Sequence, residues 1–275
     1  MLFINKSDTT TYGNSDRISA YTAWCRDFIR DFVRRNDPKY RTDCDVFVRC
    51  FFRALWSFWK HALPMIVFMF VYYGSFILIE QTDRPHYTEM HVWIDDLIPF
   101  CEIFIIPYLF WFIFMVLSCV YFYAFDRPTY LRVAKLLCFG MTLFIGLSIV
   151  FPNIQYLRPA VMPRDNIFTQ MIADLYAKDT PTNLVPSIHV YNTLCVLLGV
   201  RISTDRILQK RAVRMTMRVF GGLIILSTMF IKQHSFIDVT CAFITMFAAW
   251  EIMKKLETLR EDRAGEKRRG IAGAR

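Results

Sequence analysis

The sequence predicts an all-α, polytopic membrane protein with six transmembrane helices and both termini in the cytoplasm. Three observations support this prediction. Hydrophobic residues make up 55% of the 275 residues, including 26 Phe, 13 Tyr and 6 Trp, whereas a soluble domain has about 45–50%. Lys and Arg number 33 against 24 Asp and Glu, a net charge of +9. These charges lie mostly outside the apolar runs, in basic segments that alternate with acidic ones.

Six apolar runs are expected to form the spans, because a helix needs about 20 mostly apolar residues to cross a hydrocarbon core of about 30 Å. Lys135, near the start of the third run, is the one Lys or Arg within them. The last two runs are short and must extend through polar neighbours to cross the membrane. The predicted spans are 62–79, 103–125, 133–151, 184–200, 219–231 and 239–250.

The distribution of Lys and Arg orients these spans, since cytoplasmic loops carry the excess of positive charge. Basic residues are concentrated before the first span, after the second, after the fourth and in the tail. The loop 82–98 instead holds four acidic residues against Arg84 alone. Because spans alternate in direction, every basic segment falls on one side, and both termini are predicted to be cytoplasmic.

The chain is expected to divide into a basic, amphipathic cytoplasmic segment (1–57), a six-helix membrane domain (58–255) and a charged cytoplasmic tail (256–275). The first 15 residues lack an apolar run, so no cleaved signal peptide is expected. An aromatic stripe follows at helical spacing, and it suits either the anionic inner leaflet or packing against the protein's own spans. The stripe consists of Tyr21, Trp24, Phe28 and Phe32, opposite Arg26, Arg30 and Arg34.

Three clusters of reactive residues lie at the ends of the predicted spans. They are Arg158-Pro159 after the third span, the run 186–189 that opens the fourth, and His234 with Asp238 between the fifth and sixth. An ionisable residue at this depth costs about 2.5–3.5 kcal/mol on insertion scales, so each is a functional candidate. Odd spans exit outward and even spans begin outward, which places all three clusters at the extracytoplasmic face.

The residue types in these clusters suit phosphoryl transfer. The guanidinium of Arg158 offers a planar fork of donors for phosphate oxygens. Ser187 adds a hydroxyl at the start of a helix, where free N–H groups favour an anion. His234 and Asp238 are one turn apart, so the carboxylate can orient the imidazole as a nucleophile or base. His189 can protonate a leaving oxygen.

Neither a metal nor a cofactor is expected. The eight cysteines form no CxxC pair, and the acidic first outer loop (His86, Glu89, His91, Asp95 and Asp96) matches no zinc pattern, so it is predicted to be solvated. No glycine-rich phosphate-binding motif occurs, so no nucleotide is expected to bind. The basic charge is explained by membrane orientation, and no nucleic-acid partner is expected.

The motifs R-P, P-S-x-H and S-T-x5-H-x3-D occur in this order, the last from Ser227 to Asp238. The order resembles the type 2 phosphatidic acid phosphatase superfamily of membrane lipid phosphatases, whose signatures are K-x6-R-P, P-S-G-H and S-R-x5-H-x3-D on a six-span fold. The resemblance covers about residues 60–255. It implies that His234 attacks phosphorus, that Asp238 orients it, that His189 acts as general acid and base, and that Arg158 and Ser187 bind the phosphate.

Three positions depart from those signatures. Phe151 stands where the superfamily has Lys, Ile188 replaces Gly, and Thr228 replaces Arg. These changes, together with the stretches 94–100 and 105–108, are similar to the branch that contains sphingomyelin synthases and inositol-phosphorylceramide synthases. With two cations absent, Lys232 and Arg164 are candidate substitutes for phosphate binding.

The resemblance implies a lipid phosphatase of the cell membrane that hydrolyses a phosphomonoester or pyrophosphate at the extracytoplasmic face. Its expected partners are membrane lipids and a phospholipid, isoprenyl phosphate or sphingoid phosphate substrate. If the acceptor is another alcohol instead of water, the same residues make a head-group phosphotransferase. A transporter or a structural membrane protein, in which the motif residues only pack helices together, is the alternative that involves no chemistry.

Overall fold

The computed structural model describes residues 30, 33–34, 44–82 and 84–273. The chain divides into two units, Met1–Val67 and Phe68–Arg275, and the predicted boundary at 57/58 lies somewhat earlier than this division. The predicted aromatic stripe from Tyr21 to Phe32 lies outside the described residues. Helices dominate the described part of the chain, as predicted, and the two strands there contain two residues each.

Five helices are long and apolar enough to cross a membrane, in agreement with five of the predicted spans. The last of them continues past the predicted boundary at 255/256 as one helix. The six-span count and the cytoplasmic termini stay predictions. The five helices are α2 (Cys44–Glu80, apolar from Ala62), α4 (Ile105–Phe125), α5 (Arg127–Val150), α8 (Arg211–Phe230) and α9 (Phe236–Gly273).

The fourth predicted span forms a shorter helix, α7 (Ile188–Ile202). Its 15 residues extend about 22 Å, less than the hydrocarbon core. The predicted start at 184 is too early, because Pro186 and the capping hydroxyl of Ser187 set the first helical residue at Ile188. Helix α7 packs against α4, α5, α8 and α9, so it lies at the centre of the second unit.

Close packing around α7 depends on a small residue in α5. A Cβ atom added to Gly140 would lie 2.0 Å from Cε1 of Tyr191. Tyr191 is fully buried, and its hydroxyl donates to the carbonyl of Leu136 at 2.8 Å. The Tyr191 ring of α7 thus packs directly against Gly140 of α5. The missing side chain at Gly140 lets the two helix backbones approach closely.

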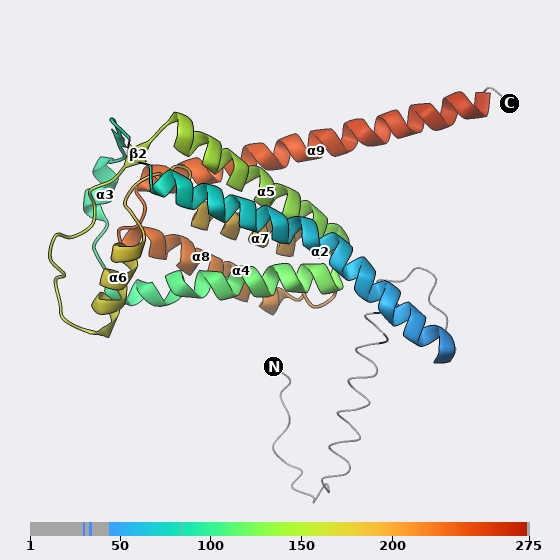
Figure 1. Ribbon diagram of the computed structural model, residues 1–275, viewed down its shortest axis with the longest axis horizontal. Coiled ribbons are helices and arrows are strands. Elements are labelled where there is room, and N and C mark those ends of the chain that lie inside the picture. The colour runs from blue at the N-terminus through green and yellow to red at the C-terminus, as the bar shows by residue number, and fades with distance from the viewer. Residues whose placement is uncertain (1–29, 31–32, 35–43, 83, 274–275) are drawn as a thin grey trace, which may run out of the picture. The chain divides into compact units, whose positions relative to one another are not determined.

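The short elements gather at one end of these helices, which we call the loop end (Figure 1). They are α3 (Trp93–Leu97), the 3-10 turn η1 (Glu102–Phe104), α6 (Ile167–Lys178) and the parallel pair β1 (Thr88–Glu89) and β2 (Asn153–Ile154). Backbone hydrogen bonds join their loops, including Cys101 N–H to the carbonyl of Phe230 at 3.0 Å. The connections α2–α4, α5–α7 and α8–α9, which are distant in the sequence, therefore meet at this end.

At the opposite end of the helices, Asp126 joins the start of α5 to the segment that follows α7. It caps α5 by accepting from Thr129 N–H, and its carboxylate also accepts from the Ser203 hydroxyl and Thr204 N–H after α7. Burial raises the pKa of Asp126, but these hydrogen bonds outweigh burial and hold that pKa below its ordinary value. A carboxylate at this position is therefore well satisfied although it is buried.

Candidate active site

His234 and Asp238 lie at the loop end, where the α8–α9 connection enters α9. The Nδ1 atom of His234 is 3.4 Å from Oδ2 of Asp238, and both side chains are almost completely buried. The same oxygen accepts from Ser235 N–H at 2.9 Å. The predicted i, i+4 pair thus exists, with a long hydrogen bond of the kind that often tightens when a substrate binds.

His189 faces His234 from the first turn of α7. The two imidazole centroids are 5.8 Å apart. The rings of Tyr108 and Trp111 in α4 lie against His189, with centroids 4.9 and 4.5 Å away. Its Nδ1 atom is buried and has no hydrogen-bond partner among the described residues. The fold therefore brings together the two histidines that lie 45 positions apart in the sequence.

Arg158 lies in the loop between β2 and α6, where three hydrogen bonds hold its guanidinium. Nη1 donates to the carbonyls of Tyr176 and Asp179 at 3.3 and 2.8 Å, and Nη2 donates to Oε1 of Gln233 at 2.7 Å. The guanidinium also lies over the Tyr176 ring, 4.4 Å from its centroid. The Nε–H is buried without a partner in the described part of the chain. Burial lowers the pKa of Arg158 because desolvation disfavours the charge.

Ser187 is fully buried and caps α7, where its Oγ accepts from Val190 N–H at 3.5 Å. Its backbone N–H donates to the carbonyl of Asp238 at 3.2 Å. The start of α7 is thereby tied to the first turn of α9. This contact joins the second predicted motif to the third.

Lys232 and Arg164, the two candidate substitutes for the missing cations, have other partners. The Nζ atom of Lys232 donates to the carbonyls of Asp95 and Ile98 at 2.8 and 2.6 Å. Burial lowers its pKa, opposed by the nearby Asp95 and Asp96 carboxylates. Arg164 pairs with the Glu102 carboxylate at 2.7 Å. The structure therefore directs both side chains toward the loop segment 95–102, and no contact with the histidine pair is found among the described residues.

Asp95 corrects the prediction of a solvated first outer loop. Its side chain is 2% exposed. Oδ1 accepts from Phe236 N–H at 2.7 Å, and Oδ2 accepts from the Ser235 hydroxyl at 2.5 Å. His91 and Asp96 follow the prediction, because both are exposed and pair with each other. Asp95 is buried because its carboxylate satisfies the first N–H of α9, one of the donors that a helix start leaves without an intrahelical acceptor.

Gln233 and Asp179 are two further polar residues that the motifs did not identify. Gln233 is almost fully buried and joins the loop before His234 to Arg158. Burial raises the pKa of Asp179, and the positive charge of Arg158 opposes that rise. A lone Gln beside a His carries no sequence signal, and the position of Asp179 depends on how α6 packs.

Unpaired buried polar atoms concentrate around the histidines. Buried side-chain atoms are hydrogen-bonded in most proteins, so each exception calls for an explanation. Arg158 Nε, Gln233 Nε2, His189 Nδ1 and Asp238 Oδ1 all have no partner in the part of the chain that the structure describes. Two of these atoms are donors from neighbouring side chains. Such a pair is suited to an anion that carries several acceptor oxygens.

Among residues 30, 33–34, 44–82 and 84–273, no group of three or more His, Cys, Asp or Glu side chains is placed to hold a metal ion. The loop end brings together two imidazoles, a carboxylate and a guanidinium. We compared the chain with protein-family models, curated proteins and solved structures, and none of them matches it.

Proposed function

We propose that the chain is an integral membrane enzyme that hydrolyses a phosphomonoester or pyrophosphate of a lipid at the extracytoplasmic face. One observation carries the proposal: His189 of α7 and His234 of the α8–α9 connection face each other at 5.8 Å beside Asp238 and Arg158 Nε–H, which has no partner among the described residues. A phosphoryl group bound between the two imidazoles would contact both. Its oxygens would supply the acceptors that the buried donors of Arg158 and Gln233 lack.

In the first step the Nε2 lone pair of His234 attacks phosphorus, and the bond from phosphorus to the lipid oxygen breaks. Asp238 accepts the Nδ1–H of His234, so it holds the reactive tautomer and stabilises the positive charge that develops on the ring. His189 donates its proton to the departing oxygen. The products of this step are a phosphohistidine, a deprotonated His189, and either the lipid alcohol from a phosphomonoester or the lipid monophosphate from a pyrophosphate.

In the second step His189 takes a proton from water, whose oxygen attacks the phosphorus of the phosphohistidine. The phosphorus–nitrogen bond breaks, His234 is regenerated, and inorganic phosphate leaves. Arg158 and the first backbone N–H groups of α7 face the negative charge of the transferred group in both steps. His189 returns to its protonated state, so the cycle is balanced.

A head-group phosphotransferase is the second candidate, and the surroundings of His189 favour it. Tyr108 and Trp111 cover the His189 ring, and apolar walls that exclude water protect a reactive intermediate from hydrolysis. An alcohol acceptor would then attack the phosphohistidine in place of water. The absence of cations at Phe151 and Thr228 is the sequence feature that points to the same branch.

The first experiment measures phosphate release by the purified full chain in detergent with EDTA present. The substrates are phosphatidic acid, phosphatidylglycerol phosphate, an isoprenyl pyrophosphate and a sphingoid phosphate. We compare wild type with His234→Ala, and use His91→Ala as the matched control because His91 is exposed in the outer loop. We expect release by wild type and by His91→Ala, and none by His234→Ala.

The outcomes separate the three functions. Release that depends on His234 supports the phosphatase, and the preferred lipid names the substrate class. No release from any substrate, together with labelled head-group exchange between lipids that requires His234, supports the transferase. If neither reaction occurs and His234→Ala only lowers the unfolding temperature, the residues pack helices together and the enzyme proposal is wrong.

A further inference from the structure

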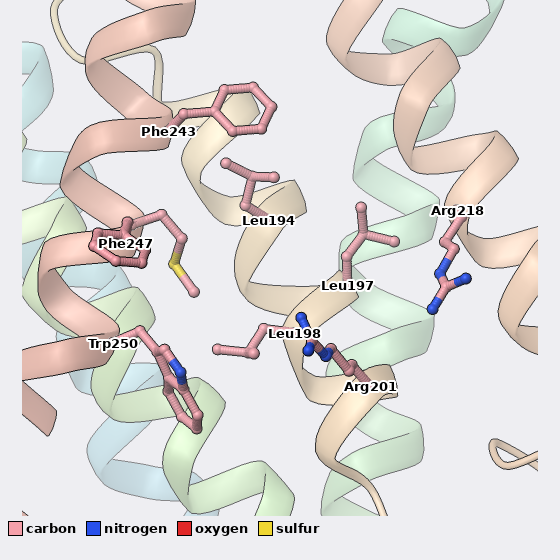
Figure 2. A pocket seen from close by; sticks show the side chains of 9 residues that line it. Leu194, Leu197, Leu198, Arg201, Arg218, Phe243, Phe247 and Trp250 are labelled. Atoms are coloured by element: carbon pink, nitrogen blue, oxygen red, sulfur yellow. The ribbon is translucent and has the colours of Figure 1, made fainter. Parts of the chain in front are cut away.

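A groove on the second unit lies between α7, α8 and α9, with a cavity volume of about 430 Å³ (Figure 2). Helix α9 contributes Phe243, Met246, Phe247 and Trp250 to its lining. Their spacing of i, i+3, i+4 and i+7 places all four on one face of the helix. Phe243 and Phe247 are about half or more exposed, so the groove is an apolar surface that the described helices do not close.

Helix α7 forms a second wall with the same spacing, because Leu194, Leu197, Leu198 and Arg201 also follow i, i+3, i+4 and i+7. Three of these positions are apolar, and the fourth carries a charge. Arg201 is twelve residues beyond His189, about 18 Å along the helix axis. The charged end of the groove is therefore far from the histidine pair.

Arg218 of α8 joins Arg201 beside this groove (Figure 2). Both side chains are exposed, and neither guanidinium forms a hydrogen bond or ion pair with any residue that the structure describes. The neighbouring cation Lys254 is different, since its Nζ pairs with Glu251 at 2.7 Å. The groove thus combines apolar walls with two guanidinium groups that have no acidic partner on the described surface.

We propose that this groove binds one anionic phospholipid. Its acyl chain would lie against the leucines of α7 and the aromatic side chains of α9, and its phosphate would lie between Arg201 and Arg218. Basic pockets between transmembrane helices bind anionic head groups in this manner, and a guanidinium fork matches phosphate oxygens.

This site is independent of the proposed function, because none of its residues lies among the histidine, aspartate and arginine groups at the loop end. Exposed arginines are also attracted nonspecifically to a charged membrane, and the proposed site must be distinguished from this effect. The chain offers a matched control for that effect. Arg206 and Arg211 are two exposed cations at the same end of α7 and α8, and neither lines the groove.

Native mass spectrometry of the full chain in detergent measures the bound lipid directly. The probes are phosphatidylglycerol and phosphatidylcholine with the same acyl chains. Inorganic phosphate is the competitor that lacks acyl chains. We expect wild type to bind phosphatidylglycerol at least tenfold more tightly than phosphatidylcholine.

The double variant Arg201→Gln with Arg218→Gln should lose that preference. Phe247→Ala should weaken the binding of both lipids. The control Arg206→Gln with Arg211→Gln and the variant His234→Ala should both bind as wild type does.

Four results would overturn the proposal. They are equal affinity for the two lipids, an unchanged preference in the Arg201/Arg218 variant, full competition by millimolar inorganic phosphate, and a lipid-free dimer that covers the groove. If the double variant does not fold, a photoreactive phosphatidylglycerol is cross-linked to wild type. Attachment within 194–201 or 243–250 supports the site, and attachment only elsewhere refutes it.

Discussion

Three of the residues that the motifs predicted have hydrogen-bond partners that explain their position. Asp238 lies 3.4 Å from Nδ1 of His234, Ser187 caps α7, and Arg158 is fixed by two carbonyls and Gln233. Gln233 escaped prediction because its side-chain oxygen accepts from Arg158, which is 75 positions away in the sequence. Chemical type and local spacing predict which groups can react, and the hydrogen bonds that fix Arg158 come from residues 18 to 75 positions away.

Arg158→Lys tests whether the guanidinium itself is needed. A lysine ammonium cannot reproduce the planar fork that contacts the carbonyls, Gln233 and a phosphate together. We expect kcat/KM to fall by more than tenfold in the phosphate-release assay, with a larger change in KM than in kcat. Arg206→Lys, in an exposed loop at the other end of α7, is the control and should not change either constant. Unchanged kinetics in Arg158→Lys would show that another cation binds the phosphate.

Asp238→Asn tests the orienting role of the carboxylate. The amide oxygen can still accept from Ser235 N–H, so the start of α9 should keep its structure. The negative charge that stabilises the developing imidazolium is lost, and we expect kcat to fall at least tenfold, about 1.4 kcal/mol of transition-state stabilisation. The unfolding temperature should change little. A large drop in that temperature with normal kcat would assign Asp238 a purely structural role.

At the scale of elements, two contacts between segments that are distant in the sequence position the helices that carry the site. Asp95, at the centre of α3, accepts from the first N–H of α9, 141 positions later in the sequence, and from the hydroxyl of Ser235 just before that helix. Gly140 in α5 leaves space for the ring of Tyr191, so α7 packs closely against α5. Helix α7 carries His189, and α9 carries Asp238, so both contacts act on the geometry between the two histidines.

Replacing Asp95 removes the cap of α9. Asp95→Ala leaves the buried N–H of Phe236 and the hydroxyl of Ser235 without an acceptor. We expect a loss of about 2 kcal/mol in the free energy of unfolding, measured by thermal or denaturant unfolding in detergent. Asp96→Ala is the matched control, because Asp96 is exposed and pairs only with His91. That change should stay within about 0.5 kcal/mol. Similar losses in both variants would contradict the capping role.

Gly140→Ala tests the α5–α7 contact. The new methyl group would overlap the Tyr191 ring and force it from its hydrogen bond with the Leu136 carbonyl. We expect the free energy of unfolding to fall by about 1–3 kcal/mol, the usual cost of overpacking. A Cβ on Gly146, six residues further along α5, has nothing within 4 Å. Gly146→Ala should therefore be neutral or slightly stabilising, since alanine favours the helix.

At the scale of the whole molecule, the charge distribution and the helices agree on which segments share an end. The predicted extracytoplasmic loops are the segments that meet at the loop end, where Arg158, His189 and His234 lie (Figure 1). The basic connections after α4 and α7 meet at the opposite end through Asp126. An arrangement with both termini in the cytoplasm is consistent with this grouping, and it can be measured.

Epitope tags test that orientation in intact cells. A tag at either terminus should become accessible to antibody only after the membrane is permeabilised, because positive-inside charge holds both ends in the cytoplasm. A tag inserted after Pro85, in the first acidic loop, should be accessible without permeabilisation. Labelling of one terminus but not the other in intact cells would show an odd number of spans. The short helix α7 would then be the first candidate for a segment that does not cross.

The sequence by itself determined the helical class, five membrane-length helices and the chemical types at the candidate site. These depend on residue composition and on spacing within one helix, which are local properties. Only the tertiary structure decided that α7 is central, that Asp95 is buried, and that Lys232 and Arg164 bind partners within the segment 95–102. Each of these depends on contacts between segments far apart in the chain. A polar side chain takes whichever partner the packed helices bring within reach, and no local pattern specifies that partner.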